Sequence, residues 1–210
     1  MEDYRTIHGT ATGEYEEKKS RFIAALSFAD SEEAAVAFLE QVRAANRTAR
    51  HNVYAYRLRE GNRERYSDDG EPAKTAGTPA LEVLQHSGLT DLIVVVTRYF
   101  GGVLLGAGPL LRAYQGTAKL ALAAAGISVV RRWMELTIPC GYSILGKITQ
   151  EIPVWDGVVL DTEYGADVVI KALLPEGKEG DFAKRVLDLT AGTVQTAVTG
   201  ETLKAVPVSG

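Results

Sequence analysis

The sequence predicts an α+β protein of two domains. Its most apolar segment, Leu92–Val96, is typical of a strand buried on both faces, and it leads through a glycine-rich turn into a helical segment. The last third of the chain arranges its expected elements in the order β-α-β-β-α-β, which is the ferredoxin-like topology. A length of 210 residues accommodates two small domains. We therefore expect one domain at residues 1–132 and a second at 133–210.

Alternating residues, helix caps and turn formers predict the elements of the first domain. A helix is expected to begin at Asp30, because Glu33 completes a capping box and apolar residues recur at helical spacing after it. Gly126 is expected to end the last helix. The predicted elements are strands at 6–15 and 20–27, a helix from 30, a strand at 51–58, a turn at 60–62, a polar loop at 67–79, a short helix at 80–86, the strand around 92–96 and a helix at 109–125.

A strand from residue 127 to about 138 is expected to carry the chain into the second domain. Beyond it, Gly165 and Ala166 form the turn of a hairpin, and Gly192 ends the last helix. The predicted elements of this domain are a strand at 133–140, a helix at 143–152, hairpin strands at 157–164 and 167–174, a helix at 181–189 and a strand at 193–199.

Composition excludes several classes of protein. The single cysteine, Cys140, excludes an internal disulfide and a cysteine-rich metal site. No apolar run approaches the roughly 18 residues that a membrane span requires, and the polar N-terminus has no signal-peptide pattern. We therefore expect a cytoplasmic protein with no membrane partner. The sequence does not predict its oligomeric state.

An arginine-rich segment stands out against the net charge of −4. Residues 43–65 contain seven arginines and two glutamates, and arginine favours bidentate recognition of phosphate or carboxylate groups. The segment therefore predicts an anion-binding face. The alternative is a solvated face whose charge is balanced by acids elsewhere, such as Asp68, Asp69 and Glu71.

The glycine-rich turn is the strongest candidate for a binding site. Arg98 follows the buried strand, and Pro109 suits the first position of a helix whose free N–H groups favour an anion. The alternative role of Arg98 is a structural ion pair with Asp91, Asp68 or Glu71. Tyr99 and Phe100 could stack on bases, although strand alternation sends one of them into the core. The turn and the helix also supply Gly101, Gly102, Gly106, Gly108 and Arg112.

Two further groups of residues invite a chemical interpretation. Asp68, Asp69 and Glu71 could hold a magnesium ion, but the same residues are natural turn formers, which we favour. His51 begins a strand and has no metal-ligand spacing with His8 or His86, so we expect a structural or binding role. No catalytic residue and no cofactor is predicted.

Four segments in the first domain carry a resemblance to a known family. They are KKSRFIA at 18–24, ARHNVYAY at 49–56, SDDGEPAKTAGTP at 67–79 and RYFGGVLLGAGPLLRAY at 98–114. In this order they resemble the IMPACT family, whose bacterial members are called YigZ-like. The chain departs from the family pattern at three positions. The pattern has a glycine in place of Lys74 and in place of Pro109, and commonly a cysteine in place of Val53.

The resemblance implies both a fold and a role. The family's first domain resembles the ribosomal S-five domain-two fold, and its second resembles a ferredoxin-like domain of translation elongation factor G. Eukaryotic members regulate translation by binding an activator of a kinase that phosphorylates initiation factor two. They use an additional N-terminal domain for which this chain has no room.

Combining the residues with the resemblance, we expect a translation-linked regulator, not an enzyme, that binds RNA or a ribosomal or translation-factor surface through a basic, glycine-rich cleft. One alternative is an enzyme or sensor acting on a phosphorylated small molecule. The other is a regulator that contacts only proteins. The expected anion-binding residues are Arg50, His51, Arg57, Lys74, Arg98, Tyr99, Gly101, Gly102, Gly106, Gly108 and Arg112.

Overall fold

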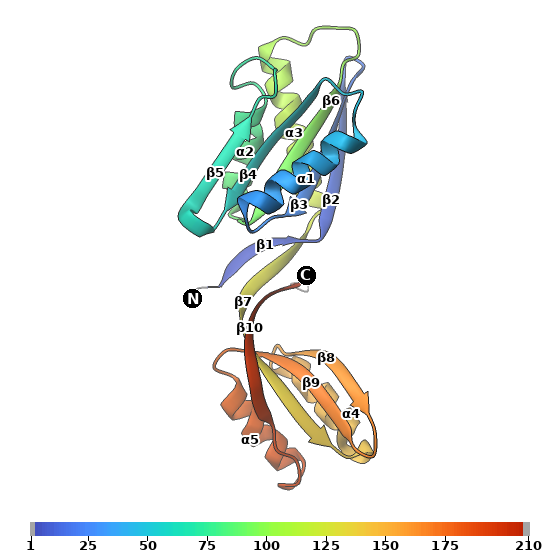
Figure 1. The fold of residues 1–210 in the computed structure, drawn as a ribbon, viewed down its shortest axis with the longest axis vertical. Helices are drawn as coiled ribbons and strands as arrows, with labels where there is room; N and C mark the ends of the chain where they lie inside the picture. The colour runs from blue at the N-terminus through green and yellow to red at the C-terminus, as the bar shows by residue number, and fades with distance from the viewer. Residues whose placement is uncertain (1–2, 208–210) are drawn as a thin grey trace. The chain divides into compact units, whose positions relative to one another are not determined.

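The computed structural model describes residues 3–207, which form two compact units. The N-terminal unit comprises mainly residues 4–129, and the C-terminal unit mainly residues 130–204. Each combines a sheet with helices, so the predicted α+β class is confirmed (Figure 1). Within residues 3–207 no helix is both long and apolar enough to cross a membrane.

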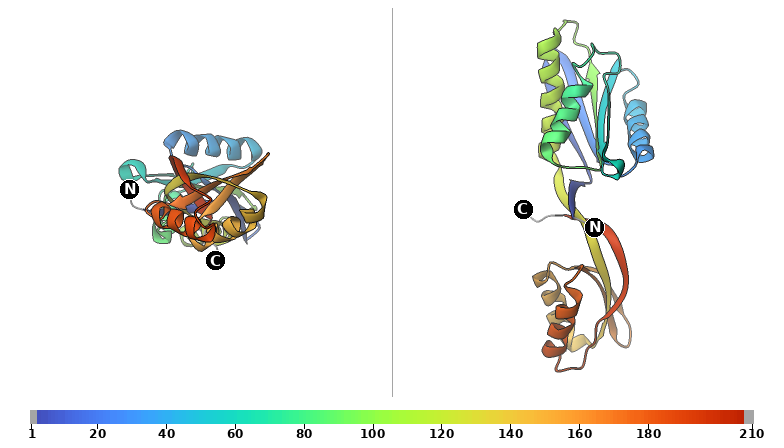
Figure 2. Two further views of the ribbon diagram at one scale, coloured as in Figure 1. Left: turned by 90° about the horizontal axis from the view of Figure 1, so that it is seen from below. Right: turned by 90° about the vertical axis from the view of Figure 1, so that its left-hand side faces the viewer.

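The N-terminal unit is built on a five-stranded sheet in the order β2-β3-β6-β4-β5. Helix α1 covers one face of this sheet, and α2 and α3 cover the other (Figure 2). All four strand pairs are antiparallel. The elements of the unit are β1 (Tyr4–His8), β2 (Thr10–Glu17), β3 (Ser20–Phe28), α1 (Glu32–Ala45), β4 (His51–Leu58), a 3₁₀ turn (Glu60–Asn62), β5 (Arg63–Ser67), α2 (Gly77–Ser87), β6 (Leu92–Tyr99) and α3 (Ala107–Ala124).

Strand β6 is the centre of the sheet, as its apolar sequence predicts. Every residue of β6 except Tyr99 is buried. Because side chains alternate along a strand, Val94 and Val96 pack into the core under α2 and α3, while Ile93 and Val95 pack into the core under α1. Arg98 shares the parity of Val94 and Val96, which directs its side chain to the α2 and α3 face.

Several predicted boundaries in this unit need correction. Helix α3 begins at Ala107, so Pro109 occupies its third position instead of its first; proline is tolerated there because first-turn N–H groups need no intrahelical partner. The N-cap of α1 is Ser31, whose hydroxyl accepts a hydrogen bond from the Ala34 amide, in place of Asp30. Gly9, at φ 68°, divides the first predicted strand in two. Strand β5 was not predicted.

The C-terminal unit has the predicted β-α-β-β-α-β order. Strands β7, β9 and β8 lie in this order, β10 pairs with β7, and one face of the sheet carries a core beneath α4 and α5. The last strand begins at Ala197, later than the predicted residue 193, because residues 193–196 form an irregular loop after Gly192. The elements are β7 (Gly126–Cys140), α4 (Tyr142–Val154), β8 (Val158–Tyr164), β9 (Val168–Pro175), α5 (Glu179–Leu189) and β10 (Ala197–Pro207).

Candidate anion-binding site

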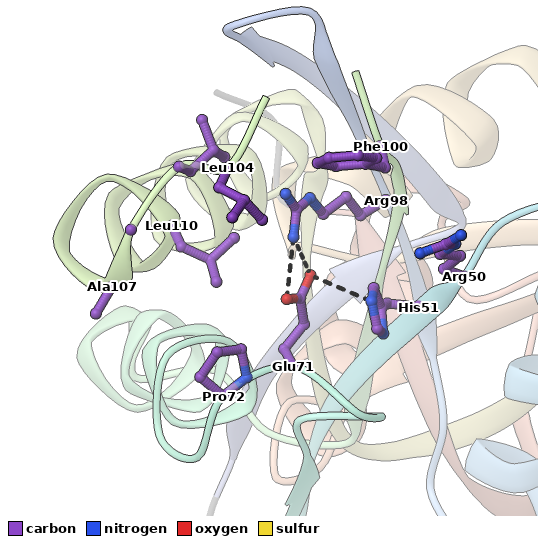
Figure 3. Close-up of a pocket in the computed structure, with 11 residues that line it drawn as sticks. Arg50, His51, Glu71, Pro72, Arg98, Phe100, Leu104, Ala107 and Leu110 are labelled. Carbon is purple, nitrogen blue, oxygen red and sulfur yellow. Dashed lines mark hydrogen bonds and ion pairs between the residues drawn. The ribbon is translucent and has the colours of Figure 1, made fainter. Parts of the chain in front are cut away.

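A pocket of about 460 Å³ lies in the N-terminal unit, between the end of β6 and the start of α3. One part of its wall is cationic, and another part is apolar (Figure 3). The lining residues are Arg50, His51, Glu71, Pro72, Arg98, Phe100, Leu104, Leu105, Gly106, Ala107 and Leu110. The size falls within the range of about 300–1,000 Å³ that is usual for small-ligand sites.

Sheet register places the polar residues of the pocket. Arg98 on β6 lies directly opposite Phe22 on β3 and directly opposite His51 on β4. These three residues therefore form one row across the sheet, and directly opposed side chains lie close together. A shift of β4 by one residue would turn His51 to the other face of the sheet.

Arg98 is held by a buried carboxylate. Its Nη1 atom lies 2.7 Å from Oε1 and 3.0 Å from Oε2 of Glu71, and the two side chains are only 8% and 4% exposed. The Tyr114 hydroxyl donates a further hydrogen bond of 2.7 Å to Oε1. Burial, and then the negative charge of Glu71, raises the pKa of Tyr114, so this hydroxyl keeps its proton and acts as a donor.

The rest of the Arg98 guanidinium is unsatisfied. Within residues 3–207, Nε is fully buried and has no hydrogen-bond partner, while Nη2 is not fully buried and no residue accepts a hydrogen bond from it. The guanidinium carbon lies 5.5 Å from the centre of the Phe22 ring and 5.7 Å from that of Phe100, so the rings hold the cation in place. Because Nη2 is not fully buried, an anion in the pocket can accept a charge-assisted hydrogen bond from it.

His51 has a defined tautomer. Its Nδ1 atom lies 2.7 Å from the backbone carbonyl oxygen of Asp69. A carbonyl oxygen only accepts hydrogen bonds, so Nδ1 carries the proton in neutral His51 and Nε2 carries a lone pair. Nε2 lies 3.9 Å from Glu71 Oε1, which is beyond hydrogen-bond distance.

Two further features add positive charge to the pocket. Arg50 is exposed at its rim and has no carboxylate within ion-pair distance in the described part of the chain. Helix α3 begins at the wall of the pocket, and its N-cap, Gly106, has a φ of 78° and no capping side chain. The free N–H groups of the first turn, including those of Ala107 and Gly108, therefore remain available to an anion.

The opposite part of the wall is apolar and accessible. Leu104 is 84% exposed and Phe100 is 45% exposed, and Leu105 and Leu110 lie buried behind them. A ligand that places an anion on Arg98 can therefore cover apolar surface with the remainder of its structure.

The acidic loop, residues 67–79, has a structural role, because its three carboxylates, Asp68, Asp69 and Glu71, bind different partners within the protein. Asp68 accepts hydrogen bonds from the amides of Lys74, Ala76 and Gly77, which caps the start of α2. Asp69 accepts from the Asn52 amide and pairs with Arg43, while Glu71 holds Arg98. No group of three potential metal ligands occurs within residues 3–207, so the magnesium interpretation of Asp68, Asp69 and Glu71 has no support in the geometry.

The structure brings together only some of the residues predicted for the site. Arg50, His51, Arg98 and Gly106 line the pocket, and Gly108 belongs to the adjoining first turn of α3. Arg57 is bound elsewhere, to the Glu64 carboxylate and to the carbonyl oxygens of Leu84 and Leu89. The predicted residues outside the pocket lining are Arg57, Lys74, Tyr99, Gly101, Gly102, Gly108 and Arg112.

Several of these outlying residues have structural explanations. The Tyr99 hydroxyl donates to the Asn46 side chain. Gly101 packs so tightly on the β2–β3 turn that an added Cβ would lie 2.1 Å from the carbonyl carbon of Lys19. Lys74 is exposed and has a φ of 64°, which explains the glycine that the family pattern has at this position.

The arginine-rich segment is largely balanced by acids, as the alternative interpretation held. Arg43 pairs with Glu40 and Asp69, and Arg57 pairs with Glu64. Arg63 and Arg65 both lie within ion-pair distance of Glu32. The apolar wall of the pocket was missed, because Val103 and Leu104 lie in a turn without periodicity and the sequence does not show that they are exposed.

Comparisons with known proteins agree with this architecture. The family model for the Impact N-terminal domain matches residues 18–122, and that for a domain of unknown function, DUF1949, matches residues 138–193. The chain is similar to a solved structure described as a crystal structure of a hypothetical protein. The TM-score is 0.62 and the identity 36%, over 95% of this chain and 98% of that one.

Curated relatives cover both units. The chain is 37% identical to "IMPACT family member YigZ" of Escherichia coli K12, over 93% of this chain and 97% of that protein. It is 35% identical to "IMPACT family member YvyE" of Bacillus subtilis, over 91% and 89%. A eukaryotic relative, "Protein IMPACT homolog" of Dictyostelium discoideum, is 40% identical over 43% of this chain and 27% of that protein. The matching domains and the full-length bacterial relatives show that this chain belongs to the IMPACT family.

Proposed function

We propose that this protein takes part in the regulation of translation by binding single-stranded RNA, with one phosphate group seated in the Arg98 pocket. The link to translation comes from the family, whose eukaryotic members are translation regulators. The observation that carries the binding proposal is the Arg98 guanidinium, which Glu71 fixes through Nη1 alone, leaving Nη2 free to donate to a ligand. Arg50 and the free N–H groups of α3 add positive potential at the same place.

The shape of the pocket favours a flexible strand over a duplex. A volume of about 460 Å³ admits one small group at a time, whereas a duplex presents its phosphates along a broad surface. The half-exposed Phe100 ring stands beside Arg98, and exposed aromatic rings stack on unpaired bases. The balanced charges of the arginine-rich segment also argue against a long cationic track.

A phosphorylated small molecule is the second candidate ligand. The compact pocket and the small number of unpaired cations around it favour this alternative. It would use Arg98, Arg50 and the α3 N-terminus in the same way.

The test compares two arginines of the same segment. Arg50 lines the pocket, and Arg47 is also exposed but does not line it. Binding of a fluorescent single-stranded RNA of twelve nucleotides is measured by anisotropy for the wild type, Arg50→Ala and Arg47→Ala. Loss of a charge-assisted hydrogen bond predicts that Arg50→Ala weakens binding about tenfold or more, while Arg47→Ala changes it about twofold at most.

Two results would contradict the proposal. One is the absence of RNA binding at low salt, and the other is an equal effect of the two substitutions. A third outcome is that RNA does not bind, while a nucleoside monophosphate raises the melting temperature of the wild type but not of Arg50→Ala. In that case the ligand is a phosphorylated small molecule.

A further inference from the structure

Besides the Glu71 carboxylate, which is bonded to Arg98 and Tyr114, the pocket contains a second hydrogen-bond acceptor, on His51. With its proton on Nδ1, neutral His51 presents the Nε2 lone pair, and no residue within 3–207 donates to it. Glu71 Oε1 lies 3.9 Å from Nε2. That oxygen is itself an acceptor, already bonded to Arg98 and Tyr114, so it cannot satisfy Nε2.

Apart from the Glu71 carboxylate, which Arg98 neutralises, the other polar groups of the pocket suit an anion. The donors are Arg50, Arg98 and the first-turn amides of α3. They could hydrogen-bond all the oxygens of an unsubstituted phosphate. Such a phosphate would leave the His51 lone pair unused. A ligand that also carries a hydroxyl group close to the phosphate would satisfy both kinds of group.

The register of the sheet sets the distance between these two functions. His51 and Arg98 are direct cross-strand neighbours, which places their Cβ atoms roughly 4.5–5.5 Å apart. A ribose 2′-hydroxyl lies on the carbon next to the one that bears the 3′-phosphate, so one nucleotide can reach both side chains. Deoxyribose lacks this hydroxyl.

We infer that the pocket selects ribonucleotides over deoxyribonucleotides, because His51 Nε2 accepts a hydrogen bond from the 2′-hydroxyl beside the phosphate that Arg98 binds. The inference rests on the phosphate site proposed above. It names His51 as the residue that determines sugar specificity. The same chemistry is available in an RNA strand and in a free nucleotide.

The experiment measures RNA and DNA oligomers of the same sequence against the wild type and two variants. In His51→Asn, the amide nitrogen occupies roughly the place of Nδ1 and keeps a donor for the Asp69 carbonyl, but nothing reaches the place of Nε2. In His51→Gln, the longer side chain returns an amide oxygen to that place. One hydrogen bond predicts that the wild type prefers RNA about three- to tenfold.

The variants should change that preference and little else. His51→Asn is expected to bind RNA and DNA equally, because it loses more affinity for RNA than for DNA, and its unfolding midpoint should lie close to that of the wild type. His51→Gln is expected to recover part of the preference. An equal loss for RNA and DNA in His51→Asn would mean that His51 only supports the structure, and would overturn the inference.

A pair of free nucleotides separates this inference from the proposed function. Adenosine 3′-monophosphate and 2′-deoxyadenosine 3′-monophosphate are compared by calorimetry on the same proteins. If both oligomers bind the wild type equally, RNA binding stands and sugar selection is wrong. If neither oligomer binds but the ribonucleotide is preferred over the deoxyribonucleotide, sugar selection stands and the RNA function is wrong. Absence of binding by every probe overturns both.

Discussion

Arg98 Nη1 lies 2.7 Å from Glu71 Oε1, in an ion pair whose side chains are 8% and 4% exposed. The two charges depend on one another, because water reaches neither well enough to replace the partner. Glu71 therefore stabilises the fold and at the same time aims the cation of the pocket. The same carboxylate also accepts a hydrogen bond from the hydroxyl of Tyr114, which lies in the middle of α3. This bond connects the acidic loop to the helix.

Removal of Glu71 should destabilise the N-terminal unit strongly. Glu71→Ala leaves a buried guanidinium without a counter-charge, and we expect a loss of about 3–5 kcal/mol in the free energy of unfolding, measured with urea. Glu71→Gln keeps an oxygen acceptor and should lose less. The control is Glu40→Ala, which removes an exposed ion pair with Arg43 and should cost about 1 kcal/mol or less. Equal costs for Glu71→Ala and Glu40→Ala would contradict the structural role of the buried pair.

Gly101 should not tolerate a side chain. A Cβ atom there would approach the Lys19 carbonyl carbon to 2.1 Å, so Gly101→Ala forces the β2–β3 turn away from the end of β6. We expect a cost of about 1–3 kcal/mol or more. Gly108→Ala is the matched control, since its Cβ would meet only Arg112 Nη1, at 3.6 Å, and alanine favours the helix. Thermal unfolding of both variants tests the difference, and a stable Gly101→Ala protein would contradict the packing.

The Cys140 thiol should react slowly in the folded protein. The residue is 5% exposed, and burial, followed by the charge of Asp167, raises the pKa of the thiol. A raised thiol pKa means that less of the reactive thiolate is present near neutral pH. Alkylation by a maleimide at pH 7.5 should therefore be slower by about tenfold or more in native protein than in urea-unfolded protein. Similar rates in the two states would show that Cys140 is accessible.

The sequence was sufficient for the elements that depend on local patterns. Strand β6 was predictable because both of its faces are apolar, and β4 because its residues alternate between two cores. Strand β5 was missed because its sequence, RERYS, is polar and it forms the edge of the sheet, where burial leaves little pattern. The start of helix α3 was predicted two residues late, because proline is common at the first position of a helix and Pro109 lies at the third.

The sequence indicated which segments form the candidate site, but it did not show which of their side chains contact one another. Arg98 had three acidic candidates as partners, and the choice of Glu71 depends on the path of a loop in which Asp68 is bound to the start of α2. The orientation of His51 depends on the Asp69 backbone carbonyl, which no side-chain pattern reveals. The exposed Leu104 lies in a turn without periodicity, so its place beside Phe100 could not be inferred.

The row formed by Phe22, Arg98 and His51 has a consequence for when the pocket forms during folding. These residues meet only when β3 and β4 have both paired with β6, and contacts around them join positions as far apart as Ser20 and Gly101. A partly folded chain would therefore have no pocket, and only a chain whose sheet is complete could bind a ligand there. A ligand at one hundred times its dissociation constant would protect the N-terminal unit against unfolding by about 2.7 kcal/mol. In a cell, ligand supply would then set the lifetime of the protein against proteolysis as well as its occupancy.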